Sequence, residues 1–192
     1  MATTAQKWKV VVVVEDDTDG KALAELVRRS GLPIALDWLP ANGIGNIKRK
    51  GGRLIQLARS RFGAGAGCVA VLVDRDGKDA RKAEPHRTIR RDCASHGAAY
   101  VEAVESLEAW FLADPAIAEW LGLKQHGSVD AVKDPKQVVA AAFYKQTRRT
   151  YQRRRSRQQV AQHASGIEPM QSTSWRNALA LLQPCLTGAK GR

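Results

Sequence analysis

Two apolar runs that end abruptly in acids place the strongest constraint on how this 192-residue chain folds. Lys9 to Val14 reads KVVVVV before Glu15, and Cys68 to Val73 reads CVAVLV before Asp74. Continuous β-branched runs of this kind are typical of strands that are buried on both faces. Such strands occur mainly in parallel sheets with helices on either side. The two runs therefore predict an α/β fold.

The segments around these runs fit the same fold. Helical patterns alternate with short strand-like runs, and Thr18 or Asp19 is the expected cap of the first helix. This βαβαβαβ order predicts a Rossmann-like, roughly four-stranded parallel sheet with right-handed crossovers and helices on both faces. The predicted helices cover about 18–30, 46–62, 82–96 and 106–113, and the additional strands cover 34–39 and 98–104.

The character of the sequence changes beyond about Gly122. We expect residues 1–122 to form the α/β domain and residues 123–192 to form a basic helical extension packed on it. Three helical segments are predicted there, over 135–147, 155–164 and 174–182, the last capped by Ser172 or Thr173.

Acidic side chains follow both buried strands. In an open parallel sheet, ligands bind at the carboxyl ends of the strands. Glu15 ends the first run, and Asp74 and Asp76 end the second, two residues apart and so on the same side of an extended backbone. Bringing three carboxylates together is costly unless a hard cation such as Mg²⁺ or Mn²⁺ binds them. The pattern predicts a divalent-metal site, although these acids can also cap helices or pair with Arg28, Arg75 or Arg81.

The same residues resemble a known family. A Glu after the first strand and Asp-x-Asp after a later strand resemble the Toprim domain of topoisomerases, primases and OLD-type nucleases, and VEDDTDGKALAELV is similar to its "EGxTD" form. The segment VEAVESLEAWFLADP is similar to the EAW-x-LAD signature of small Toprim-like proteins found beside ATPase genes in bacterial defence islands. Together these motifs span roughly residues 9 to 115.

The resemblance implies a function and a set of site residues. Glu15, Asp74 and Asp76 correspond to metal-binding, catalytic acids, and Asp19 and Glu108 to accessory catalytic ones. It also implies a role in antiphage defence with an ATPase partner. One position departs from the family pattern, because Asp16 stands where Gly usually follows the first Glu. The alternative interpretation of Glu108 is that it is an acid at the start of a helix, where the helix macrodipole favours negative charge.

Charge points to a polyanionic partner. The formal net charge is +12, and seven Lys and Arg residues against one acid follow position 150. A basic body around an acidic pocket suits DNA or RNA binding, although basic loops can also be merely solvated. Arginines contact phosphates with paired donors. The candidate nucleic-acid-binding residues are Lys48, Lys50, Arg53, Arg149, Arg153, Arg154 and Arg155.

Three functional hypotheses remain open. The first is a Mg²⁺-dependent nuclease of Toprim type. The alternative is a non-catalytic, nucleic-acid-binding Toprim subunit, and a primase-type nucleotidyl transferase comes third because the sequence offers no separate nucleotide-binding module. The chain shows no signal-peptide pattern or membrane-length apolar run, and three widely spaced cysteines imply no disulfide framework, so we expect a cytoplasmic protein. DNA versus RNA preference, cleavage specificity and oligomeric state are not predicted.

Overall fold

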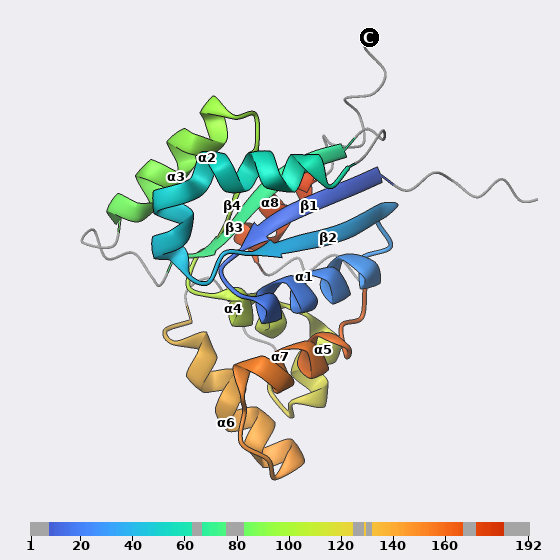
Figure 1. Ribbon diagram of the computed structural model, residues 1–192. Helices are drawn as coiled ribbons and strands as arrows, with labels where there is room; N and C mark the ends of the chain where they lie inside the picture. The colour runs from blue at the N-terminus through green and yellow to red at the C-terminus, as the bar shows by residue number, and fades with distance from the viewer. Residues whose placement is uncertain are drawn as a thin grey trace, which may run out of the picture.

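A parallel β-sheet forms the centre of the molecule (Figure 1). The computed structural model describes residues 8–62, 67–75, 83–124, 129, 132–166 and 172–182. Within them, four strands follow the order β2-β1-β3-β4, with every neighbouring pair parallel. The predicted α/β fold is therefore confirmed. The strands are β1 (Trp8–Val14), β2 (Ile34–Pro40), β3 (Gly67–Asp74) and β4 (Ala99–Ala103).

Helices connect and follow the strands, mostly at the predicted positions. The expected helix over 135–147 has the same bounds in the structure, whereas the one expected over 155–164 begins two residues earlier. The helices are α1 (Asp17–Arg29), α2 (Ile44–Ser60), α3 (Ala83–Ser95), α4 (Leu107–Ala113), α5 (Pro115–Trp120), α6 (Pro135–Thr147), α7 (Arg153–Ala161) and α8 (Thr173–Leu182).

The sheet is covered on both faces, as predicted. Alternate residues of β1 belong to two separate apolar clusters: Val10, Val12 and Val14 to one, Val11 and Val13 to the other. Helices α1, α4 and α8 contribute to the first cluster, and α2 and α3 to the second. Each valine is therefore buried, which explains why β1 reads as an unbroken apolar run.

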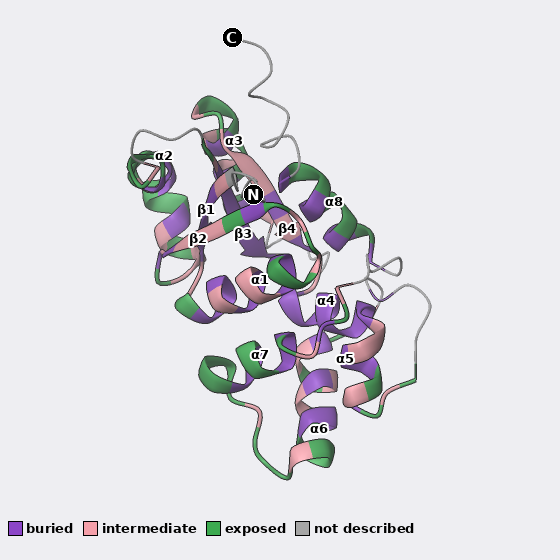
Figure 2. Ribbon diagram, turned by 90° about the vertical axis from the view of Figure 1, so that its right-hand side faces the viewer, coloured by how far each residue is buried: buried purple, intermediate pink, exposed green. Residues whose placement is uncertain are grey.

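The C-terminal helices share the first of these two clusters. Phe143 of α6 and Val160 of α7 are buried in it together with residues of the sheet. Figure 2 shows buried segments, in purple, on both of these helices. Helix α7 packs on α1 and helix α6 packs on α4. Trp110 of α4 lies 4.9 Å, between ring centroids, from Trp175 of α8 and donates a hydrogen bond to Ser174. The extension is thus continuous with the core of the sheet.

The strand order creates a switch point between β1 and β3. The chain leaves β1 for β2 on one side and then crosses β1 to reach β3 on the other. Helices α1 and α2 consequently lie on opposite faces of the sheet. Open parallel sheets bind ligands at such points.

The cysteines differ from expectation. Cys68, at the start of β3, is disulfide-bonded, which the wide spacing of the three cysteines does not indicate. Cys93 of α3 is a free and buried thiol. In the described part of the chain, no helix combines the length and apolar character needed to cross a membrane.

Candidate metal centre

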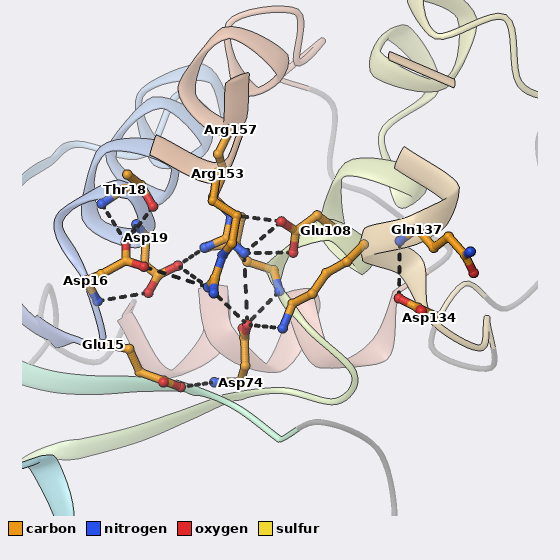
Figure 3. A network of polar contacts seen from close by, with 12 residues as sticks. Glu15, Asp16, Thr18, Asp19, Asp74, Glu108, Asp134, Gln137, Arg153 and Arg157 are labelled. Carbon is orange, nitrogen blue, oxygen red and sulfur yellow. Dashed lines mark hydrogen bonds and ion pairs between the residues drawn. The ribbon is translucent and has the colours of Figure 1, made fainter. Parts of the chain in front are cut away.

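Two of the predicted acids meet at the switch point. Glu15 directly follows β1, and Asp74 is the last residue of β3. The backbone N–H of Asp74 donates a hydrogen bond of 3.1 Å to Oε1 of Glu15 (Figure 3). The third predicted ligand, Asp76, lies outside the described residues.

Asp74 is the more deeply buried of these two acids. Its Oδ1 accepts a hydrogen bond of 3.0 Å from the backbone N–H of Leu107, at the start of α4. Its Oδ2 lies 3.3 Å from Nζ of Lys136 and 4.0 Å from an Nη2 atom of both Arg153 and Arg157. Burial raises the pKa of Asp74 to about 7, which Lys136 opposes and the charges of Glu108 and Glu15 reinforce. Burial therefore disfavours the carboxylate form of Asp74 despite the cations nearby.

Asp16 and Asp19 both serve the start of α1. Oδ1 of Asp16 accepts hydrogen bonds from the backbone N–H groups of Thr18 and Asp19, and Oδ2 of Asp19 accepts one from the backbone N–H of Asp16. This reciprocal arrangement is a capping box. The expectation that Thr18 or Asp19 caps the helix is wrong, because the acid one position before the helix satisfies its free N–H groups. The unusual Asp16 has a local structural role here.

Arg157 is the centre of the polar network in Figure 3. Its side chain is fully buried, and so is that of Glu108. Its Nε donates to Glu108 Oε1 at 3.0 Å, and its Nη2 donates to both carboxylate oxygens at 2.7 and 2.8 Å. Tyr151 also donates to Glu108, and Nη1 of Arg157 forms an ion pair with Asp19. Burial lowers the pKa of Arg157 to about 10, so the guanidinium is cationic at neutral pH.

Sequence reasoning misses Lys136 and Arg157 as site residues. Six arginines lie between positions 148 and 157, and the sequence alone does not distinguish the buried one. One signal is present: Arg157 precedes Val160 and Ala161 by three and four residues, so it shares their buried helix face. Arg153 lies one turn before Arg157 and pairs with Asp16, Asp19 and Asp74 at 3.7–4.0 Å.

The other candidate nucleic-acid-binding residues lie on two sides of the carboxyl edge. Lys48, Lys50 and Arg53 are exposed on the first half of α2, where Lys48 pairs with Glu84 at 2.5 Å. Arg149, Arg154 and Arg155 are exposed on and before α7. The basic residues thus flank the acidic centre but come from helices on opposite faces of the sheet.

The described part of the site is rich in carboxylates. Among the described residues, its network contains five carboxylates and three cations: Glu15, Asp16, Asp19, Asp74, Glu108, Lys136, Arg153 and Arg157. Ser106, next to Leu107, has a buried hydroxyl without a hydrogen-bond partner among the described residues. No three acidic, His or Cys side chains in the described ranges already converge as a metal site. Glu15 and Asp74 fit a hard cation as oxygen donors, with Asp76 the predicted third.

No protein-family model, curated protein or solved structure matches this chain. The Toprim-like resemblance therefore rests on the motifs in the sequence. The fold and the polar network stand independently of it, because both are properties of this chain's own residues.

Proposed function

We propose that this protein is a Mg²⁺- or Mn²⁺-dependent nuclease that cleaves phosphodiester bonds in nucleic acid. One observation carries the proposal: Glu15 and Asp74 meet at the switch point of the sheet, beside the buried carboxylates of Asp19 and Glu108. Glu15, Asp74 and Asp76 would hold the metal ion. A bound divalent ion lowers the pKa of a water molecule and neutralises charge on a phosphate.

The residues around Asp74 supply the rest of the chemistry. The Leu107 N–H donates to the Asp74 carboxylate, and the Glu15 carboxylate accepts from the Asp74 backbone N–H, so both the side chain and the backbone of Asp74 are held at the strand end. Lys136 and Arg153 are partly exposed, with side-chain exposures of 34% and 45%, so both can contact a phosphate that approaches from solvent. Lys48, Lys50, Arg53 and the arginines near α7 would bind the nucleic-acid backbone farther away.

The motif resemblance supports a wider role for this activity. We place the nuclease in antiphage defence in the cytoplasm, together with an ATPase partner protein that senses infection. Co-purification of the tagged protein with the product of a neighbouring ATPase gene tests this part. Recovery of the tagged protein alone would contradict it.

A specific observation favours a second candidate, a non-catalytic nucleic-acid-binding subunit. Three cations of the chain itself face Oδ2 of Asp74. A site that is compensated in this way can bind phosphate electrostatically without a metal ion. This candidate predicts nucleic-acid binding in EDTA and no cleavage with Mg²⁺ or Mn²⁺.

One experiment separates the two candidates. The purified protein is incubated with end-labelled single- and double-stranded DNA and RNA in Mg²⁺, Mn²⁺ or EDTA, and the products are resolved on a gel. The nuclease proposal expects metal-dependent cleavage that Asp74→Asn abolishes. Asp37→Asn is the matched control, because Asp37 lies on β2, is half exposed and pairs only loosely with Arg61. Cleavage by Asp74→Asn at the wild-type rate would overturn the proposal.

A further inference from the structure

The guanidinium of Arg157 lies between two buried carboxylates that come from different helices. Glu108 belongs to α4 and Asp19 to α1, and both are at least nine-tenths buried. Arg157 belongs to α7. A single positive group thus joins three helices that are far apart in sequence (Figure 3).

Each oxygen of these two carboxylates already has a hydrogen-bond or ion-pair partner, and Oδ1 of Asp19 has ion pairs alone. Oε1 and Oε2 of Glu108 accept from Arg157, and Oε1 also accepts from Tyr151. Oδ1 of Asp19 forms an ion pair with Arg157, while Oδ2 accepts the capping hydrogen bond of Asp16. In contrast, the described cations approach Oδ2 of Asp74 only at ion-pair distances of 3.3–4.0 Å.

We infer that Arg157 takes the place of a second metal ion, so that the site holds one divalent cation on the side of Glu15 and Asp74. This inference rests on the proposed function. A second ion between Asp19 and Glu108 would have to displace a buried guanidinium and leave it without a partner, which is strongly unfavourable. Asp19 and Glu108 therefore bind Arg157 and not a metal ion.

Arg157 also acts as a positioning residue for Asp74. Its bidentate interaction holds Glu108 in the first turn of α4. The neighbouring residue in that turn, Leu107, donates its N–H to Oδ1 of Asp74. The guanidinium thereby fixes the helix start that orients the metal-binding carboxylate.

The number of Mn²⁺ ions bound per chain tests the inference. We would titrate the full chain with Mn²⁺ at pH 8 and count bound ions by electron paramagnetic resonance and calorimetry. Wild type is expected to bind one ion. Asp74→Asn should weaken this binding roughly 10- to 100-fold or more, because it removes a ligand. Asp19→Asn should weaken the binding far less than Asp74→Asn does, because it removes a neighbouring charge but no ligand.

Removing the guanidinium gives a complementary test. Arg157→Ala is expected to bind a second Mn²⁺ ion at the vacated carboxylates, and Arg157→Lys is expected to restore the count of one because it returns a cation. A purely structural arginine would not change the count. If Arg157→Ala fails to fold, the inference is decided by the number of Mn²⁺ ions that wild type binds and by the affinity of Asp19→Asn for Mn²⁺.

Different results would overturn the inference about Arg157 and the nuclease proposal. Two ions in wild type, or a loss of affinity in Asp19→Asn equal to that in Asp74→Asn, would overturn the inference. One bound ion without cleavage of any nucleic acid would sink the nuclease proposal and leave the inference standing. No bound Mn²⁺ in wild type would overturn both.

Discussion

Glu108 and Arg157 show how a single charged residue acquires its role from burial. Both side chains have no exposed surface, so neither charge is stabilised by water. Removing two charges from water is expensive, and each is tolerated because the other supplies paired hydrogen bonds. Removing one partner of this buried pair therefore lowers the stability of the protein far more than replacing both partners with apolar residues would.

Glu108→Gln should destabilise the protein by about 3–5 kcal/mol, because it leaves the buried Arg157 without its main counter-charge. Urea unfolding followed by circular dichroism measures this loss. Glu84→Gln is the control, since Glu84 forms an exposed pair with Lys48 and should leave the free energy of unfolding almost unchanged. Equal losses in the two variants would contradict the importance of burial.

Cys93 should react slowly with alkylating reagents. Burial raises the pKa of its thiol to about 12, and the nearby Asp92 adds to the shift. Because the thiolate is the reactive form, on the order of one molecule in ten thousand is reactive at pH 8, and the rate should rise about tenfold per pH unit from about 7 to 10. Peptide mapping after timed iodoacetamide treatment measures the rate. Labelling of Cys93 as fast as in urea-unfolded protein would refute the expectation.

At the level of elements, the packing of α1 against β2 depends on one glycine. A Cβ atom on Gly20 would lie 2.1 Å from the ring of Trp38. The indole N–H of Trp38 donates to Asp17 at 2.9 Å, so the ring is held over the first turn of α1. That turn carries Asp19, and its position relative to the sheet is set by this close approach.

Gly20→Ala should therefore destabilise the protein by about 1–3 kcal/mol through overpacking. This is opposite in sign to the gain of about 1 kcal/mol that alanine brings to an exposed helix. Gly45→Ala is the matched control in α2, because a Cβ there meets open space. Thermal unfolding of both variants measures the difference. A Gly20→Ala variant as stable as wild type would show that the Trp38 ring moves freely.

The elements are more predictable from the sequence than the packing between them. The runs ending in Glu15 and Asp74 are sufficient for a parallel sheet, because strands covered on both faces are uniformly apolar. Helix α6 has its predicted bounds, since Pro135 and the apolar pattern mark its start. The prediction for the cap of α1 is wrong, because several polar residues in a row can each cap a helix. Choosing Arg157 among six arginines requires the packing of α7 on α1, which is tertiary information.

For the whole molecule, the basic residues surround the acidic centre rather than forming one patch. The exposed residues of α2 and of α7 approach the carboxyl edge from opposite faces of the sheet. With a net charge of +12, electrostatic attraction to nucleic acid should be strong and sensitive to salt. A nucleic-acid strand that lies across the carboxyl edge of the sheet would contact the basic residues of both α2 and α7.

Replacing Arg154 and Arg155 with Gln should flatten the dependence of log affinity on log salt by roughly two, about one for each phosphate that no longer meets an arginine. Fluorescence anisotropy with a labelled duplex in EDTA measures this slope. Arg28→Gln with Arg29→Gln is the matched control: both arginines are exposed, pair with Glu25 and end α1 at the opposite edge of the sheet. An equal change in the control would indicate non-specific attraction to the whole surface.

The late position of the compensating cations has a consequence during translation. Asp19, Asp74 and Glu108 are synthesised first, whereas Lys136, Arg153 and Arg157 follow. A growing chain thus carries its acids uncompensated until α7 has emerged and packed on α1. A product truncated after Gly122 would retain all these acids and none of the three cations. Synthesis of α7 is therefore a built-in condition for assembling the site.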